Sequence, residues 1–502
     1  MQTTGATRCL ALDCGASSIR LIEIALDGGR LGLSELARFD NAAQSLGARL
    51  VWDYEAIYRK IAAALARAGS SGLSYASIGA DSWGVDYVLI DKRGELLGPA
   101  VSYRDPRTNG QIARYFARHF TAHDLFAATG IQCLQFNTVF QLHAQFENEP
   151  ELLRRAHRLL FTADYAHYWL SGVAANERTL ASTSQMLSPY GFWSMPILNS
   201  VGLPASALAP PVPAGTVLGA VRPQLARETG LRDVMVIAPA AHDTQSAVLC
   251  TPAAGGEDWA YLSSGTWSIL GMEAAVAFTD AGAERAGISN ESGYGGTCCV
   301  QSTVAGLWLV QEIQRLVGGV SVAGLAAAAA RTPAFRSLVD PADPRFFNPA
   351  DMTEEIRAAC REEREPVPET PAELARCAYD SLALLYRAEL QKLSAVTGRS
   401  FTKLHVVGGG SKVDLLNRLC AAAIGLPVLA GPAEATAIGN ALAQLIALGR
   451  IDGAQAARAV VAQSFPVTRF EPENLPQLDD AIGRFERIRK MSGTKPDKEE
   501  IR

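Results

Sequence analysis

The sequence lacks several features that would each define a class of protein. No apolar run reaches the length of about 18 residues that a membrane-spanning helix needs, so we expect no membrane association. The dipeptide Gly-Lys is absent, which excludes the phosphate-binding loop of P-loop enzymes. No spacing of His, Cys and carboxylate residues is typical of a zinc site. A net charge of −5 gives no reason to expect binding to nucleic acid or to an anionic membrane.

The nine cysteines show no CxxC motif and no regular pairing, which is typical of a reducing compartment, so we expect a cytoplasmic protein. Cys360 and Cys377 flank a charged, proline-containing segment that could fold two helices together. A disulfide there and a pair of reduced, partly buried thiols both remain open, and the second is favoured. Residues 1–8 are polar and lead directly into a strand, so we expect no signal peptide.

What the sequence does contain is an alternation of strand and helix patterns from end to end, which indicates the α/β class. Its 502 residues are too many for one hydrophobic core, so we expect about two or three domains. Helical spacing of apolar residues predicts a helix over 54–68, and a capping box at Thr370–Glu373 predicts a long helix ending at Gly398. A surface loop is expected over 204–223 and a hinge over 251–258.

One local pattern occurs twice, about 250 residues apart. In residues 10–20 and again in residues 260–271, an apolar strand breaks at a small, hydroxyl-rich turn and then resumes. Such turns direct several backbone N–H groups and hydroxyls toward one point, which is what a polyphosphate requires. Two of them, one in each half of the chain, indicate two duplicated lobes that hold one nucleotide between them.

Two aspartates at predicted strand ends are candidates for chemistry. Asp13 lies just before the first turn, where a carboxylate would repel phosphate unless a cation lies between them, so Mg²⁺ is indicated. An Asx turn that stabilises the loop is the alternative. Asp243 follows His242, and a base there could take a proton from a substrate hydroxyl during phosphoryl transfer. A helix N-cap is the commoner role for such an aspartate and is favoured without further context.

Two segments, residues 81–86 and 103–108, combine an aromatic residue with carboxylates and other polar groups. Sugar sites have this composition, because an aromatic ring packs on the CH face of a sugar while polar groups bind its hydroxyls. Solvated loops are an equally good interpretation. The triplet 408–410 lies between a strand and a helix and does not continue as GxGxxG. Gly409 and Gly410 could seat an adenine, or the triplet could form only a tight turn.

Together these segments resemble the FGGY family of carbohydrate kinases over nearly the whole chain, from about Cys9 to Phe470. Further segments that carry the resemblance are Phe136–Thr138, Ala241–Thr244, Tyr261–Ser268, Gly306–Leu309 and Asp343–Pro349. The resemblance implies the duplicated actin-like (ribonuclease H-like) ATPase fold, with two lobes and the active site in the cleft between them. It implies an N-terminal lobe over 1–250 with the sugar site and first phosphate turn, a C-terminal lobe over 256–470 with the second phosphate turn and adenine site, and a C-terminal helix and tail over 471–502.

The resemblance also implies roles for individual residues. Asp243 is expected to be the catalytic base, and Asp13 is expected to bind Mg²⁺ for the reason given above. The residues expected to bind the sugar are Trp83, Gly84, Arg104, His242, Asp243, Thr244 and Thr303. The residues expected to bind ATP are Ala16, Ser17, Ser18, Ile19, Arg20, Thr266, Gln311, Gly409 and Gly410.

The implied activity is ATP-dependent phosphorylation of the 1-hydroxyl of L-rhamnulose by a monomer or homodimer. Two positions depart from the pattern of relatives that act on this sugar: Ile19 replaces a glycine, and Thr303 replaces a sugar-binding asparagine. The first should leave ATP binding intact, whereas the second leaves open another ketose, such as L-fuculose or L-xylulose. The intact Asp243 disfavours a catalytically silent sensor of this fold, and the sugar-type aromatic segments disfavour a chaperone or filament.

Overall fold

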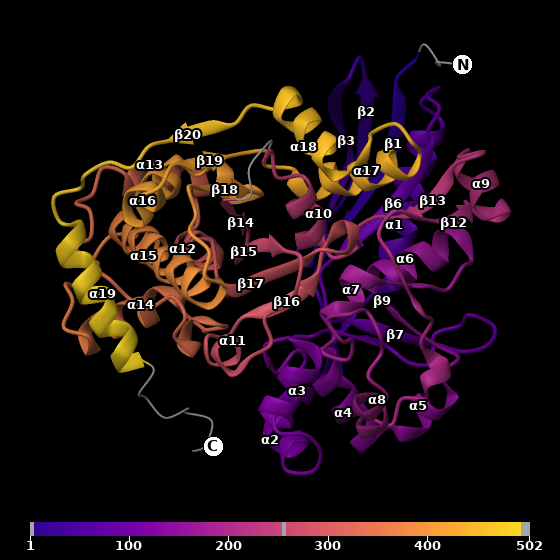
Figure 1. Cartoon of the computed structure of the whole chain (residues 1–502), viewed down its shortest axis with the longest axis horizontal. Coiled ribbons are helices and arrows are strands. Elements are labelled where there is room, and N and C mark those ends of the chain that lie inside the picture. Colours follow the sequence, from indigo (N-terminus) through magenta and orange to yellow (C-terminus); the bar gives the residue numbers. More distant parts are fainter. Residues whose placement is uncertain (1–4, 254–257, 493–502) are drawn as a thin grey trace. The chain divides into compact units, whose positions relative to one another are not determined.

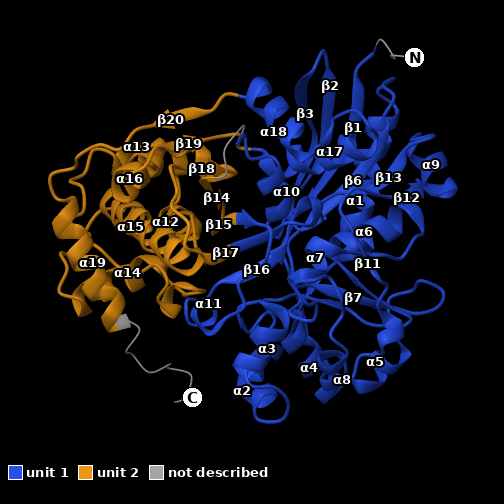
Figure 2. Cartoon of the chain, viewed as in Figure 1, with its two compact units in different colours: residues 1–254, 273–300, 434–465 blue, residues 255–272, 301–433, 466–502 orange. Residues whose placement is uncertain are grey.

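The computed structural model describes residues 5–253 and 258–492, which form two compact units (Figures 1 and 2). The first unit comprises residues 1–254, 273–300 and 434–465, and the second comprises residues 255–272, 301–433 and 466–502. A segment from late in the chain therefore completes the first unit. The expected hinge over 251–258 lies partly outside the described residues, and the tail beyond residue 492 lies wholly outside them.

The first unit is built on a six-stranded sheet in the order β12-β13-β6-β1-β2-β3. These strands are β1 (Thr7–Cys14), β2 (Ser18–Asp27), β3 (Arg30–Asp40), β6 (Ser77–Ser82), β12 (Thr216–Ala220) and β13 (Met235–Ala238). β1 pairs antiparallel with β2 and parallel with β6, which in turn pairs parallel with β13. The carboxyl ends of β1, β6 and β13 therefore meet at one edge of the sheet, which is where ligands bind in open α/β sheets.

Helices cover both faces of this sheet. Along β6, Gly79 faces α17 (Ala435–Ala447), and a Cβ at Gly79 would lie 3.0 Å from the side chains of Asn440 and Gln444. Ile78 and Ala80 point the other way, because successive strand residues alternate, and they join the hydrophobic cluster with α1 (Tyr54–Gly69) and α6 (Thr162–Ser171). The helix expected over 54–68 is confirmed.

The rest of the first unit consists of short elements. Its remaining helices are α2 (Gln111–Phe116), α3 (Ala122–Thr129), α4 (Thr138–Asn148), α5 (Pro150–Arg155), α7 (Arg178–Ser182), α8 (Met195–Ser200), α9 (Pro223–Thr229), α10 (Asp243–Leu249), α11 (Ala281–Arg285) and α18 (Gly453–Ser464). Its remaining strands are β4 (Gln44–Leu46), β5 (Arg49–Trp52), β7 (Tyr87–Ile90), β8 (Ala100–Val101), β9 (Arg158–Phe161), β10 (Asn176–Glu177), β11 (Pro211–Val212) and β16 (Ser289–Ser292). The expectation of a surface loop over 204–223 was wrong in part, because β12 lies inside it, pairs with β13 and buries Leu218.

The second unit repeats the connectivity of the first sheet. Its strands are β14 (Trp259–Ser264), β15 (Trp267–Ala274), β17 (Cys298–Ala305), β18 (Lys403–Val407), β19 (Val428–Ala430) and β20 (Thr468–Phe470), and β17 lies next to β15 in the sheet. β14 pairs antiparallel with β15 and parallel with β18, β18 pairs parallel with β19, and β19 pairs antiparallel with β20. The first unit shows the same series in β2, β1, β6, β13 and β12, so the structure contains the expected duplication.

The long helix of the second unit is α15 (Pro371–Thr397). Thr370 and Glu373 form the predicted capping box, and Gly398 ends the helix in a left-handed conformation. The other helices of the second unit are α12 (Trp308–Val317), α13 (Val322–Ala329), α14 (Met352–Glu362), α16 (Asp414–Ile424) and α19 (Leu478–Ser492). Cys360 and Cys377 are buried free thiols, as favoured above. Within the described residues, no helix has the length and hydropathy that crossing a membrane requires.

Candidate active site

The first phosphate turn joins β1 to β2 at residues 15–17. Gly15 N donates to Ser18 O at 3.0 Å, and a Cβ on Gly15 would lie only 2.8 Å from that same oxygen, so the turn requires glycine. Ser17 is exposed and available to a ligand. Ile19 is 1% exposed and belongs to the hydrophobic core, so its proposed part in ATP binding is limited to backbone atoms.

Asp13 and Asp81 are partners in register one residue before the ends of the parallel strands β1 and β6, so their side chains lie on the same face of the sheet. Arg20 forms ion pairs with both Asp13 and Glu434, and Asn440 donates from Nδ2 to Asp81 Oδ2 at 2.6 Å. Burial raises the pKa of Asp13, which the charge of Arg20 opposes, and burial also raises the pKa of Asp81. The charge of Arg20 therefore acts on both buried carboxylates, and its direct ion pair is with Asp13.

These two carboxylates fit a divalent cation. Asp81 Oδ1 is buried and has no hydrogen-bond partner, and Asp13 lies at the matching position of the adjacent strand. Among residues 5–253 and 258–492 no group of three or more His, Cys or acidic residues could hold a metal. Mg²⁺ is commonly held by one or two carboxylates, with substrate phosphates and water completing its shell. The sequence predicted Asp13 here but not Asp81, whose part depends on strand register.

Asp243 is more exposed than the other two carboxylates near this edge of the sheet, those of Asp13 and Asp81. It is the first residue of α10, and its Oδ1 accepts hydrogen bonds from N and Oγ1 of Thr244 at 2.6 and 3.3 Å. About a third of its side chain, 33%, is exposed, compared with 4% for Asp13. Burial raises the pKa of Asp243, which the charge of His242 opposes. The N-cap of α10 is His242, so Asp243 is not the capping residue that the local sequence favoured.

The segment Trp83–Asp86 forms a tight, buried turn. Asp86 Oδ2 accepts hydrogen bonds from the indole N–H groups of Trp52 at 2.7 Å and Trp83 at 2.9 Å. Val85 has a φ of +69°, a conformation that strains a β-branched residue and that the surrounding contacts must hold in place. A Cβ on Gly84 would lie 3.0 Å from the Thr183 side chain, so a larger residue would fit there only if Thr183 shifted.

Arg104 belongs to a neighbouring group in the same unit. Its Nε donates to the hydroxyl of Tyr103 at 3.0 Å, and its guanidinium lies 5.3 Å from the centre of that ring. Tyr103 also contacts Phe136 edge-on. Arg104 is therefore held against the ring of Tyr103 and remains a candidate for the sugar.

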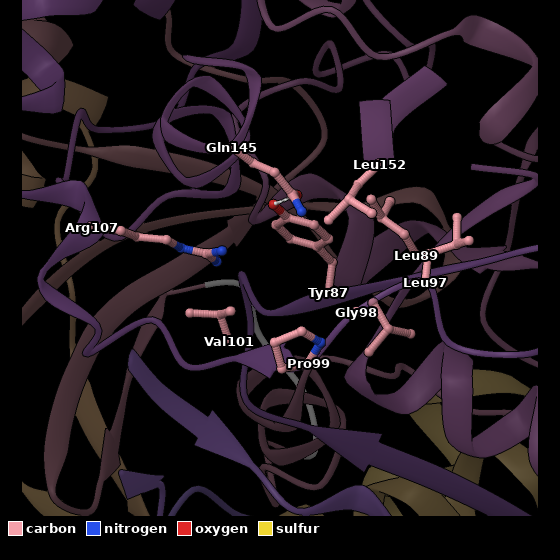
Figure 3. A pocket seen from close by; sticks show the side chains of 10 residues that line it. Tyr87, Leu89, Leu97, Gly98, Pro99, Val101, Arg107, Gln145 and Leu152 are labelled. Atoms are coloured by element: carbon pink, nitrogen blue, oxygen red, sulfur yellow. Dashed lines mark hydrogen bonds between the residues drawn. The ribbon is translucent and has the colours of Figure 1, made fainter. Parts of the chain in front are cut away.

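Separate from these groups, a small hollow is lined by residues of β7 and the segments around it, including Tyr87, Arg107 and Gln145 (Figure 3). Tyr87 Oη donates to Gln145 Oε1 at 2.7 Å across this hollow. None of the residues expected to bind sugar or ATP lines it, so it is not part of the candidate site.

The second phosphate turn and the glycine triplet lie in the second unit. Thr266 Oγ1 donates to Gln311 Oε1 at 3.3 Å, which joins two of the residues expected to bind ATP. Gly410 is buried, and a Cβ there would lie 2.0 Å from Ser264 Oγ, so close packing explains this glycine. Gly409 is exposed and remains a candidate for adenine. Thr303 is half-buried on β17.

The duplicated sheet, with carboxylates at the ligand-binding edge of its first copy, defines a two-domain phosphotransferase of the actin-like α/β fold. The N-terminal domain of the FGGY family of carbohydrate kinases matches residues 8–250, and the C-terminal domain of that family matches residues 260–448. The chain belongs to the FGGY family of carbohydrate kinases.

Curated relatives and solved structures are similar to the chain along nearly its whole length. A rhamnulokinase of Yersinia pestis (strain Pestoides F) is 43% identical, over 93% of this chain and 95% of that protein. A rhamnulokinase of Enterobacter sp. (strain 638) is 40% identical, over 96% and 98%. A ligand-bound xylulose kinase from Lactobacillus acidophilus shares the fold with a TM-score of 0.79 at 14% identity, over 97% and 98%. Plasmodium falciparum glycerol kinase with ADP has a TM-score of 0.77 at 13% identity, over 99% and 100%.

Proposed function

We propose that this chain transfers the γ-phosphoryl group of ATP to the 1-hydroxyl of L-rhamnulose. The observation that carries the reaction type is Asp243, an accessible carboxylate at the ligand-binding edge of the first sheet, next to two buried ones. Support for the sugar comes from the rhamnulokinases that are 40 to 43% identical to the chain. The reducing cytoplasm fits both the use of ATP and the nine free cysteines.

In the proposed reaction, the sugar hydroxyl gives its proton to a carboxylate oxygen of Asp243. The sugar oxygen forms the new bond to the γ-phosphorus as the bond from that phosphorus to the β–γ bridging oxygen breaks, and ADP leaves. Positioning and electrostatic stabilisation supply most of the rate in such transfers. His242 and Thr244, on either side of Asp243, are proposed to bind the sugar together with Trp83, Gly84, Arg104 and Thr303.

Residues of both units are proposed to bind ATP. In the first unit these are the exposed Ser17, the neighbouring backbone and Arg20, and in the second they are Thr266, Gln311 and Gly409. Asp13 and Asp81 would hold Mg²⁺, which when bound neutralises charge on the phosphates. Arg20 already pairs with Asp13, so it supplies positive charge beside the same carboxylate.

An ADP-release assay across a panel of ketoses tests the substrate. With L-rhamnulose, L-fuculose and L-xylulose compared at equal ATP, L-rhamnulose should give the highest kcat/KM. A higher value for another ketose would move the assignment to that sugar. Absence of ADP release with every ketose would favour the silent sensor.

A further inference from the structure

The carboxylate of Glu291 lies next to His242, on the side of the ring away from the candidate base Asp243. His242 Nδ1 is 2.8 Å from Glu291 Oε2, and His242 Nε2 is 3.4 Å from Asp243 Oδ1. A neutral imidazole has one donor nitrogen, so this ring can donate toward both carboxylates only when both nitrogens carry protons. Two carboxylates this close to the two ring nitrogens favour the doubly protonated, cationic ring over the neutral one.

The same short helix fixes both sides of this contact. Ser292 N, next to Glu291 on β16, donates to Ser182 Oγ on α7 at 3.0 Å. His242 N donates to Thr179 Oγ1, also on α7, at 3.1 Å. Because α7 anchors the backbone on each side, the separation between Glu291 and His242 is set by the fold.

We propose that Glu291 is a positioning residue for the reaction assigned under the proposed function. Its carboxylate holds the doubly protonated ring of His242 against Asp243, so that the base stays ionised and oriented until the sugar hydroxyl arrives. His242 then acts as a fixed cation that receives no proton, and the proton from the sugar stops on Asp243.

The charges around His242 support this arrangement. Burial alone would lower the pKa of His242, but the charge and hydrogen bond of Glu291, with the charges of Asp243 and Glu177, raise it to about 9. Gln245 Nε2 donates to the same Glu291 oxygen at 3.0 Å and holds that carboxylate in place. Without the negative charge at position 291, the ring would lose its strongest partner and Asp243 its cationic neighbour.

The first unit contains a second His–Glu pair that serves as a matched control. His123 Nδ1 lies 2.7 Å from Glu284 Oε2, and the His123 side chain is 59% exposed. Neither residue is among those proposed to bind sugar, ATP or metal. Glu284→Gln therefore removes the same kind of pair without touching the site.

Steady-state kinetics give the first test. We expect Glu291→Gln to lower kcat about 10- to 100-fold, because an opposite charge within a few ångströms shifts a pKa by about 1–3 units. The KM for ATP should change less than about twofold, Glu291→Asp should recover part of kcat because it keeps the charge, and Glu284→Gln should match the wild type. Wild-type kcat in Glu291→Gln, or no recovery in Glu291→Asp, would overturn the proposal.

Nitrogen NMR of [¹⁵N]histidine-labelled protein at pH 7.5, without substrates, gives a test that needs no turnover. The His242 signals, assigned by their loss in His242→Asn, should show both nitrogens protonated in the wild type and one in Glu291→Gln. Glu284→Gln should change the His123 signals only. A neutral His242 ring in the wild type would overturn the proposal, even if Glu291→Gln failed to fold or the chain preferred a different ketose.

Discussion

The strand–turn–strand of the first unit and that of the second share a backbone plan but differ in charge. Gly15 N donates to Ser18 O at 3.0 Å in the first, and Gly265 N donates to Trp267 O at 2.9 Å in the second. Both turns end the antiparallel pair of a sheet with the same connectivity. Each unit therefore has an antiparallel strand pair joined by a short turn that begins with glycine.

The side chains around the two turns are not duplicated. Two residues before the turn glycine, the first copy has Asp13, paired with Arg20, whereas the second has Ser263. In the second turn, the side chain of Thr266 donates a hydrogen bond to the side chain of Gln311, and both side chains are neutral. The comparison teaches that the strand–turn–strand is common to both units, whereas the carboxylates proposed to hold a cation or to accept a proton lie in the first.

The largest effect on kcat should follow from substitution of Asp243, the proposed base, which lies in the first unit. Asp243→Asn keeps the shape of the side chain and its contact with Thr244, but an amide cannot take the sugar proton. We expect kcat to fall about 10² to 10⁴-fold while ATP and sugar still bind, as measured by ADP release and by calorimetric titration. Near-normal turnover would leave Asp243 with only a structural role at the start of α10.

A matched pair of substitutions tests the two turns against each other. Asp13→Asn should lower kcat/KM for ATP about 10- to 100-fold and raise the Mg²⁺ concentration needed for half-maximal rate, because a charged contact is lost. Thr266→Val should lower kcat/KM for ATP only about 2- to 10-fold, because it removes one hydrogen bond between neutral groups. An equal fall in kcat/KM in the two variants would contradict the view that the first turn acts through charge and the second through a neutral hydrogen bond.

A smaller effect is expected at the sugar contact of the second unit. Thr303→Asn exchanges a hydroxyl for an amide and should change the KM for L-rhamnulose about 2- to 10-fold. The control is the KM for ATP, which should stay constant. If neither the KM nor the order of preference among ketoses changed, Thr303 would lie outside the sugar site.

The smallest effect concerns the stability cost of the buried charges. A carboxyl group whose folded pKa is raised, as burial raises that of Asp81, contributes stability that is present below its unfolded pKa of about 4 and lost as pH rises. Asp81→Asn should therefore raise the Tm by a few degrees at pH 8, with no gain near pH 3.5, while activity falls. Calorimetry at the two pH values measures this, and a lower Tm at pH 8 would contradict it.

Much of the fold could be predicted because its signals are local. Both turns, the capping box of α15 and the helix α1 follow from residues adjacent in the sequence. β12 was missed because its strand conformation depends on pairing with β13, which outweighs a loop-like composition. The return of residues 434–465 to the first unit has no local signal either.

The site was predictable to the same extent. An apolar pattern reveals β1, near whose end Asp13 lies, and β13, which Asp243 follows at the start of α10. Asp81 becomes a partner of Asp13 only through the register of β1 and β6. Glu291 lies on β16, and its contact with His242 depends on how α7 holds both segments. The resemblance to the FGGY family supplied roles for residues whose neighbours in sequence carry no chemical signal.

The most direct test of the central claim is the product formed from L-rhamnulose and ATP, followed by ³¹P and ¹H NMR. We predict that the chain consumes ATP, releases ADP in equal amount, and forms one new phosphomonoester whose phosphorus couples to the protons on carbon 1. Unchanged ATP, or a phosphoryl group on any other carbon, would contradict the assignment.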